Sequence, residues 1–222
     1  MRIAIIGGGL AGLAAGCELS DHGHNVEIFE SRPWLGGSTY SFTSPKKLGE
    51  VDNGQHIFMH CTTAYTDFLK RLGTFHLTKQ QQLMHIPVFD ENGQRSDIRT
   101  TYLPAPLHLL PSLVYYKHLT LRQKVGIAGI LFRIKTGKTP KILKDESFDS
   151  WLRNQGQDDQ TIKDFWNFLM KPILNCNTAQ ASTTQALFVI KEGLISKKNA
   201  MAIGLPTVGL STLHIEPAKQ YI

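Results

Sequence analysis

Residues 1–30 place the strongest constraint on what this chain can fold into. Arg2–Ile6 is an apolar run of strand length, and the glycine-rich turn Gly7–Gly12 follows it at once. The pattern then predicts a helix over Leu10–His22 and a second strand over Asn25–Phe29. A strand, a glycine turn, a helix and a parallel strand in this order form a βαβ unit, whose strands we expect to be covered on both faces.

The turn matches G-x-G-x-x-G, and each of its glycines meets a different requirement. Gly7 allows a tight turn, Gly9 lets the backbone approach a pyrophosphate, and Gly12 lets the helix pack against the sheet. The helix N-terminus offers N–H groups and the positive end of a dipole to an anion. Glu30 closes the second strand, where a carboxylate accepts hydrogen bonds from ribose hydroxyls. An export signal, the alternative interpretation, leaves Glu30 unexplained. We therefore predict a bound dinucleotide held by Gly7, Gly9, Leu10, Ala11, Gly12 and Glu30.

The composition indicates a folded chain in a reducing compartment. Its 222 residues, 41% of them hydrophobic, suffice for one large domain or two small ones with a real core. Cys17, Cys61 and Cys176 are far apart and form no C-x-x-C pair, which predicts buried thiols and no metal site. No apolar run reaches the length of a membrane span. We expect a cytoplasmic protein that is not integral to a bilayer.

The formal net charge of +6 comes from one segment. Between Ile98 and Lys144 there are nine Lys or Arg residues and no Asp or Glu, so the rest of the chain is net acidic. Two apolar and basic helices are predicted here, over 112–118 and 121–135. Two interpretations stay open: the region 105–135 docks peripherally on the anionic inner face of a membrane, or its basic side is simply solvated. No nucleic-acid recognition motif accompanies the charge, so nucleic acid is not an expected partner.

A second glycine pair follows the predicted ribose carboxylate. Gly36 and Gly37 lie in the segment Ser31–Ser38, directly after Glu30. This arrangement resembles the flavin dinucleotide sites of the amine oxidase and phytoene desaturase type, in which this loop returns along the pyrophosphate. The resemblance implies FAD rather than NAD as the cofactor, and Ser31, Gly36, Gly37 and Ser38 as further contacts. Ser38 departs from the family, in which an Arg usually follows the glycine pair.

The segment D-N-G-Q-H, Asp52–His56, narrows the resemblance. With the helix and the Leu-Gly stop that follow, it resembles the squalene-associated flavin enzymes, the hydroxysqualene dehydroxylases. The resemblance implies that Gly54 allows the backbone close to the flavin ring and that Gln55 and His56 reach the ring or the substrate. It makes His56 the candidate catalytic residue. The alternative interpretation is a polar turn with a surface histidine.

The rest of the chain predicts a substrate domain of strands and helices. Residues 83–89 and 94–102 flank the turn Asp90–Gly93 and predict a β-hairpin. Helices are predicted to begin after the N-caps Ser147, Asp158 (or Asp159) and Ser182 and to cover 148–154, the run up to Met170, and 183–194. This half resembles the helical cap of the same flavin enzymes.

The expected fold class is α/β. It combines an incomplete FAD-binding Rossmann-like βαβ unit with a helical and antiparallel-strand substrate domain. The predicted divisions are residues 1–58 for the FAD-binding part, 59–210 for the substrate-binding part, and 211–222 for a helical segment that returns to the FAD-binding part. The resemblance covers the chain but corresponds to the first half of such an enzyme, and no second βαβ unit follows Glu30. We therefore expect a fragment, with a complementing C-terminal half as a partner.

The leading functional hypothesis from this resemblance is an FAD-dependent oxidoreductase of isoprenoid metabolism. Its lipophilic substrate would be hydroxysqualene, reduced to squalene in squalene and hopanoid biosynthesis. One alternative is a carotenoid desaturase of the phytoene type or an amine oxidase, which share the glycine motifs and Glu30 but not D-N-G-Q-H. Another is a flavin-binding remnant without catalysis.

Overall fold

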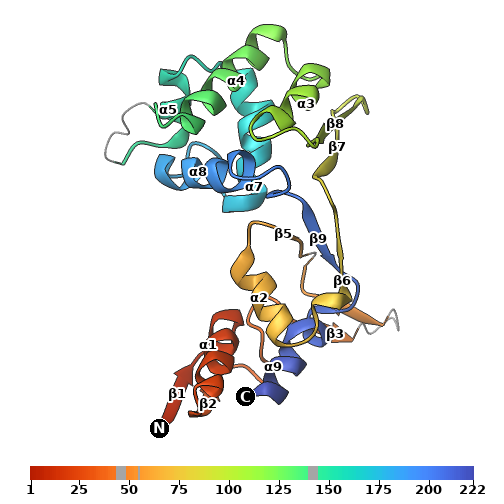
Figure 1. Ribbon diagram of the computed structural model, residues 1–222, viewed down its shortest axis with the longest axis vertical. Helices are drawn as coiled ribbons and strands as arrows, with labels where there is room; N and C mark the ends of the chain where they lie inside the picture. Colours follow the sequence, from red (N-terminus) through yellow and green to blue (C-terminus); the bar gives the residue numbers. More distant parts are fainter. Residues whose placement is uncertain (44–48, 55, 140–144) are drawn as a thin grey trace. The chain divides into compact units, whose positions relative to one another are not determined.

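The computed structural model describes residues 1–43, 49–54, 56–139 and 145–222 (Figure 1). Helices and strands are mixed along the chain, as the predicted α/β class requires. Among the described residues no helix is both long enough and apolar enough to cross a lipid bilayer.

The chain forms two compact units, each with its own set of elements. Unit 1 comprises Met1–Gln80 and Ile203–Ile222, and unit 2 comprises Gln81–Ala202. These divisions differ from the predicted ones after residues 58 and 210. The first division differs because the helix that follows residue 58 packs on the βαβ core. The second differs because the strand Ile203–Pro206, which lies before residue 210, pairs with strands of unit 1.

The centre of unit 1 is a parallel pair of strands connected by a helix. Strand β1 (Arg2–Ile6) pairs in register with β2 (Asn25–Phe29), and α1 (Leu10–Asp21) lies between them in sequence. Within the described residues only one face of these strands is covered: α1 lies on that face, and alternate residues of both strands are exposed on the other. The exposed side chains are Arg2, Ala4, Ile6, Asn25, Glu27 and Phe29.

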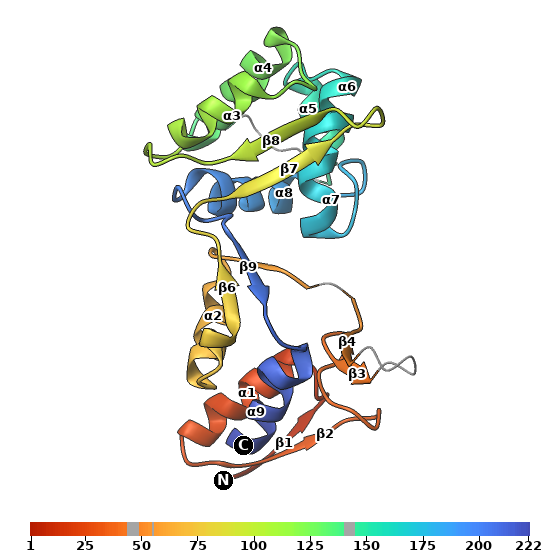
Figure 2. The same cartoon turned by 90° about the vertical axis from the view of Figure 1, so that its right-hand side faces the viewer.

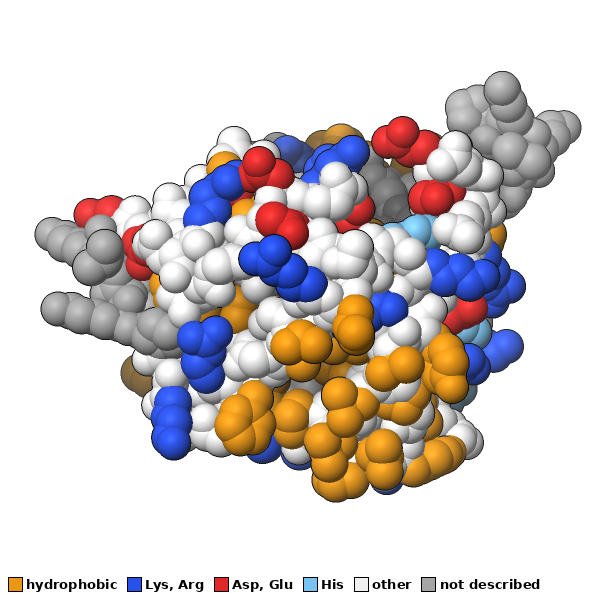
Figure 3. Space-filling model, turned by 90° about the horizontal axis from the view of Figure 1, so that it is seen from above, with side chains coloured by type: hydrophobic (Ala, Val, Ile, Leu, Met, Phe, Trp, Pro, Cys, Tyr) orange, Lys and Arg blue, Asp and Glu red, His pale blue; other side chains and the backbone are white. Residues whose placement is uncertain are grey.

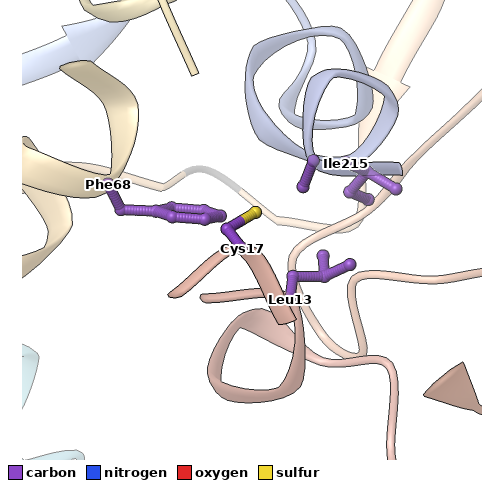
Figure 4. Packing of buried hydrophobic residues seen from close by; sticks show 5 residues of the cluster. Leu13, Cys17, Phe68 and Ile215 are labelled. Atoms are coloured by element: carbon purple, nitrogen blue, oxygen red, sulfur yellow. The ribbon is translucent and has the colours of Figure 1, made fainter. Parts of the chain in front are cut away.

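The core of unit 1 brings together segments that are distant in the sequence. Leu13 and Cys17 of α1 pack against Phe68 of the following helix and Ile215 of the return segment (Figure 4). Burial of one such large apolar side chain is worth about 1.5–3 kcal/mol. The other elements of unit 1 are β3 (Ser41–Thr43), β4 (Glu50–Asp52), β5 (Phe58–Met59), α2 (Thr63–Arg71), η1 (Phe75–Leu77), β6 (Thr78–Gln80), β9 (Ile203–Pro206), η5 (Ser211–Ile215) and α9 (Glu216–Tyr221).

Two small antiparallel sheets complete unit 1. Strands β3 and β4 form the first sheet (Figure 2), and β9 lies between β5 and β6 in the second. Because β9 comes far later in the sequence than its neighbours, unit 1 needs both of its chain segments. The helix predicted over 211–221 is confirmed, as a π-helical turn η5 that continues into α9.

Unit 2 is a hairpin with helices. The predicted hairpin is confirmed as β7 (His85–Phe89) paired with β8 (Arg95–Arg99). Its core contains stacked and edge-on aromatic rings, with Phe148 5.8 Å from Trp151 and 5.6 Å from Trp166. The helices of unit 2 are η2 (Leu107–Leu109), α3 (Leu110–Tyr115), α4 (Leu121–Lys135), α5 (Phe148–Asn154), α6 (Asp159–Thr161), η3 (Ile162–Asn167), α7 (Phe168–Leu174), α8 (Thr183–Val189) and η4 (Ile190–Ile195).

Candidate dinucleotide site

The turn between β1 and α1 has the backbone that its glycines predict. Gly7 has a φ of +100°, in the region that favours glycine, and its N–H donates a hydrogen bond to the Phe29 carbonyl at 2.7 Å. Gly9 is the N-cap of α1, and no side chain caps the helix. Leu10, Ala11 and Gly12 form the first turn, where N–H groups have no acceptor four residues earlier in the helix.

The glycines of this turn differ in what surrounds them. A Cβ on Gly12 would lie 2.0 Å from the Gly7 carbonyl oxygen, so a side chain there is excluded by the fold itself. At Gly9 a Cβ would meet no atom of the described residues within 4 Å, so they leave open space next to the start of the helix. This space and the uncapped helix start fit a pyrophosphate, which needs close backbone approach and N–H donors.

Glu30 lies beside the glycine turn. Its Oε2 accepts a hydrogen bond from the Gly8 N–H at 2.8 Å, and its Oε1 accepts from the Arg32 N–H at 3.0 Å and from the Ser31 hydroxyl at 3.2 Å. The N–H donors of Arg32 and Gly8 lower the pKa of Glu30, so the carboxylate is ionised at neutral pH. A carboxylate has about four acceptor positions and the protein uses three, which leaves capacity for a ribose hydroxyl.

The second glycine pair lies against the first. The Gly36 N–H donates to the Gly8 carbonyl at 2.7 Å, and Gly36 and Gly37 have φ values of +96° and +62°. A Cβ on Gly37 would come within 3.4 Å of the Gly9 Cα. The structure therefore brings the two glycine segments together, and both positions favour glycine for conformational reasons.

The D-N-G-Q-H segment connects to the second glycine pair through its asparagine. The Asn53 side-chain N–H donates to the Ser38 carbonyl at 3.2 Å. Gly54 has a φ of +155°, and His56 Nδ1 lies 2.6 Å from the Gly54 carbonyl oxygen, to which it donates. Gln55 lies outside the described residues. Of this segment the structure thus places Asp52, Asn53, Gly54 and His56.

His214 was not among the predicted site residues, yet it holds the second glycine loop. It is fully buried in η5, and its Nε2–H donates to the Thr39 carbonyl at 3.1 Å. Its Nδ1, 3.3 Å from the Tyr65 hydroxyl, then accepts, and Thr39 in turn donates from its hydroxyl to the Gly36 carbonyl at 2.8 Å. The pKa of His214 is lowered to about 4, chiefly by burial, with the Thr39 bond acting in the opposite direction and the nearby His56 adding to the decrease.

Asp52 is the second residue whose role the sequence left open. Its Oδ1 accepts from the Leu210 N–H at 2.8 Å and from the Ser41 hydroxyl at 2.7 Å, so it ties β3 and β4 to the start of the return segment. Ser211 reinforces this tie, because its hydroxyl accepts from the Ser41 N–H at 2.9 Å. The contacts to Leu210 and Ser211 span 158 and 170 positions, and no local pattern signals them.

The described residues offer no competing metal chemistry at this site, since no three His, Cys, Asp or Glu side chains gather among them in a way that could hold an ion. The site is instead a set of backbone N–H groups, small residues and one ionised acid. That donor set suits a dinucleotide phosphate and its ribose.

Comparison with known proteins points in the same direction. Residues 10–209 match the family described as flavin containing amine oxidoreductase. The similar curated proteins include a ζ-carotene desaturase of Zea mays, 26% identical over 100% of this chain and 40% of its own length. They also include a hydroxysqualene dehydroxylase of Zymomonas mobilis, 25% identical over 98% of this chain and 50% of its own length.

Solved structures show the same fold. A putrescine oxidase structure matches 100% of this chain and 49% of its own, with a TM-score of 0.68 and 19% identity. An oxidoreductase of Methanosarcina mazei matches with a TM-score of 0.66 and 18% identity. The chain therefore spans about half the length of the proteins that it resembles, or less.

Proposed function

The chain belongs to the flavin containing amine oxidoreductase family, whose cofactor is FAD, and from this premise we propose that unit 1 holds the ADP half of FAD at the start of α1. We also propose that the whole protein is an oxidoreductase acting on a long isoprenoid. The observation that carries the proposal is the convergence on Gly8, whose N–H donates to Glu30 and whose carbonyl accepts from Gly36.

Each segment of the site has its own part in this proposal. The first turn of α1 donates N–H groups to the pyrophosphate, and Glu30 accepts from the adenosine ribose. The loop that carries Gly36 and Gly37 closes over the pyrophosphate, and His214 fixes that loop through Thr39. Bound FAD supplies the transfer of hydride. The exposed Gly54 and the neighbouring His56 lie on the loop that we expect to face the ring.

Hydroxysqualene is the substrate that we propose first. The supporting observations are the D-N-G-Q-H segment and the similarity to a hydroxysqualene dehydroxylase over 98% of this chain. In unit 2 a small, almost wholly apolar cavity lies between the hairpin and helices α3, α4 and α7. Two of the lining side chains carry hydroxyls: that of Ser112 is bonded to the Arg99 backbone, and that of Tyr116 lies 3.5 Å from the Asp164 carbonyl oxygen, to which it donates. Such a lining suits part of a hydrocarbon chain, since the cavity of about 50 Å³ is much smaller than a whole isoprenoid.

A carotene is the second candidate substrate. It is supported by the similarity of the whole chain to ζ-carotene desaturases, among them the Zea mays protein at 26% identity.

The exposed apolar ends of β1 and β2, Ile6 and Phe29, support a complementing half that covers them. Turnover of hydroxysqualene, phytoene and a polyamine by the chain joined to that half separates the candidates. Turnover of phytoene alone would reverse our order.

We predict that Glu30→Gln and Gly9→Ala both weaken FAD binding by about tenfold or more. The first loses a charged acceptor, which is worth about 1.5–3 kcal/mol, and the second fills the open space beside the helix start. The measurement is a fluorescence titration of FAD with the purified chain. Because a Cβ on Gly9 would meet no described atom within 4 Å, Gly9→Ala should leave the free energy of unfolding within about 1 kcal/mol of the wild type.

The matched control is Glu27→Gln, an exposed acid two positions before the end of β2. It should bind FAD as the wild type does. Equal affinity of the wild type, Gly9→Ala and Glu30→Gln would contradict the proposed site.

A further inference from the structure

Helix α4 of unit 2 carries apolar side chains on its outer side as well as its inner side. The inner ones are buried in unit 2. The outer ones, Leu121, Val125 and Phe132, are 78%, 64% and 61% exposed. Positions separated by four and seven residues lie on one stripe of an α-helix, so these three side chains form a continuous outward stripe. Packing among the described residues of unit 2 does not account for their position.

The segment before α4 extends this apolar surface. Leu107, Leu110 and Val114, spaced by three and four residues across η2 and α3, are also exposed. The Lys124 ammonium donates to the Val114 carbonyl at 2.6 Å, which holds the end of α3 beside α4. Figure 3 shows hydrophobic side chains gathered along one side of the face that it views. We call these six residues, Leu107, Leu110, Val114, Leu121, Val125 and Phe132, the outer apolar face.

Cations border the outer apolar face on both sides. At 3.6 residues per turn, Lys124 and Lys135 lie on one side of the α4 stripe, and Arg122 and Arg133 on the other. Lys117 follows α3. Within the described part of the chain none of these five cations is in an ion pair. The bonded ones meet neutral acceptors, such as the Ile195 carbonyl for Lys135 and Gln155 for Arg133.

The acids of unit 2 leave this surface positive. Residues 98–144 include no Asp or Glu, so none lies within the segment that forms the outer apolar face. Asp158 accepts from Thr161 and from Gln123 at the start of α4, and the positive charge of Arg122 helps to lower its pKa. This one ionised carboxylate offsets only part of the charge of the five cations. An apolar stripe with basic flanks is the pattern of a helix that lies in the surface of an anionic bilayer, with its cations at the headgroups.

We propose that the outer apolar face docks unit 2 on an anionic lipid bilayer, with α4 parallel to the membrane surface. A second copy of the chain is the less favoured occupant, because a symmetric contact would bring the basic flanks of both copies together. Anionic headgroups neutralise the same cations and gain about 1 kcal/mol for each near the surface. The proposal rests on unit 2 alone and is independent of the proposed function.

The test is co-sedimentation of the full chain with vesicles of phosphatidylcholine, with and without phosphatidylserine. It uses the chain without flavin and measures no turnover, so it stands even if the isoprenoid assignment fails. We expect binding to the mixed vesicles that weakens steeply between low and high salt, and much weaker binding to phosphatidylcholine alone.

Two double variants test the two parts of the surface. Leu121→Ser with Phe132→Ser should lower the partition coefficient by about tenfold or more, since both side chains leave the acyl boundary. Lys117→Gln with Arg122→Gln should lower it by about thirtyfold on mixed vesicles, since two headgroup contacts are lost.

Matched controls change equally exposed residues of unit 2 away from this surface. Phe188→Ser replaces a side chain of α8 that is 65% exposed, and Lys191→Gln with Lys197→Gln removes two exposed cations. Both controls should bind vesicles as the wild type does. Circular dichroism confirms that each variant is folded.

Three results would overturn the proposal. The first is absence of binding to mixed vesicles by the folded wild type. The second is equal loss of binding in the face variants and the controls. The third is a concentration-dependent dimer, seen by analytical ultracentrifugation, that the face variants abolish while lipid binding is absent.

Discussion

At the scale of single residues, unit 1 depends on a few side chains with several bonds each. Glu30 joins the end of β2 to Gly8 and to its own following loop. His214 joins the return segment to α2 and to the second glycine loop through Tyr65 and Thr39. Glu30 stays ionised because N–H donors lower its pKa, whereas His214 stays neutral because burial lowers its pKa to about 4.

The depressed pKa of His214 makes the stability of unit 1 depend on pH. Its ordinary value is about 6.5, so between pH 6.5 and 4 the unfolded chain binds a proton that the folded chain does not. The stability that His214 contributes is therefore complete above pH 6.5. It falls as the pH drops toward 4, by about 3 kcal/mol.

Urea unfolding of the wild type and of His214→Gln at pH 7 and pH 4 measures this effect. The wild type should be the more stable at pH 7, and the difference should shrink at pH 4. His22→Gln, a change at an exposed histidine, should leave the pH dependence as it is. An NMR titration in which His214 protonates near pH 6.5 would contradict the argument.

At the scale of elements, the sequence predicts where a helix begins better than it predicts whether the helix is α or π. Ser147 begins α5 as predicted, and its hydroxyl accepts from the Ser150 N–H at 3.2 Å. Asp158 begins α6 in the same way, by accepting from the Thr161 N–H at 2.7 Å. Ser182 stands at the predicted start of α8, yet its side chain makes no capping bond. The helices predicted to run to Met170 and to Leu194 contain π-helical segments part of the way along. Over so few residues, the apolar pattern of a π-helix does not differ enough from that of an α-helix to predict this.

The two serines offer a matched test of capping. Ser147→Ala should destabilise unit 2 by about 1 kcal/mol because it leaves an N-terminal N–H without its partner. Ser182→Ala removes no such bond and should cost only a few tenths of a kcal/mol. Urea unfolding followed by tryptophan fluorescence reads this out, since Trp151 and Trp166 are buried in unit 2. Equal losses in the two variants would show that the hydroxyl bond is not what matters.

At the scale of the whole molecule, unit 1 is closed by the return of the chain. The strand β9 inserts between β5 and β6, and η5 and α9 then pack against α1 and α2. Arg71 of α2 pairs with Glu18 and Asp21 of α1, which links the two helices at the surface. The candidate dinucleotide site therefore depends on residues from both ends of the sequence.

Asp52→Ala tests this closure. The substitution removes the acceptor for the Leu210 N–H and the Ser41 hydroxyl, and bonds to a charged group are worth about 1.5–3 kcal/mol. We expect unit 1 to lose about 2 kcal/mol and the amides of residues 209–222 to exchange faster in hydrogen-exchange mass spectrometry. Asp67→Ala removes an exposed acid whose pair with Lys70 is worth at most about 1 kcal/mol, and it should leave that exchange unchanged. Unchanged exchange in both variants would argue against the role of Asp52.

The sequence by itself determined the local part of this protein. Within residues 1–30 the strand, the turn, the helix and the acid are close in sequence. The glycines permit the backbone of the turn, and the spacing of apolar residues predicts the strands and the helix, so few other local structures are possible. The hairpin of unit 2 followed from its turn for the same reason.

Only the tertiary structure decided what meets across long separations. It brought Gly36 to Gly8, Asp52 to Leu210 and His214 to Thr39. It also left the outer apolar face of α3 and α4 exposed, with no partner among the described residues of unit 2. The physical reason is that such contacts depend on how buried surfaces fit once elements pack. A periodic pattern shows that a side is apolar but does not show what, if anything, covers it.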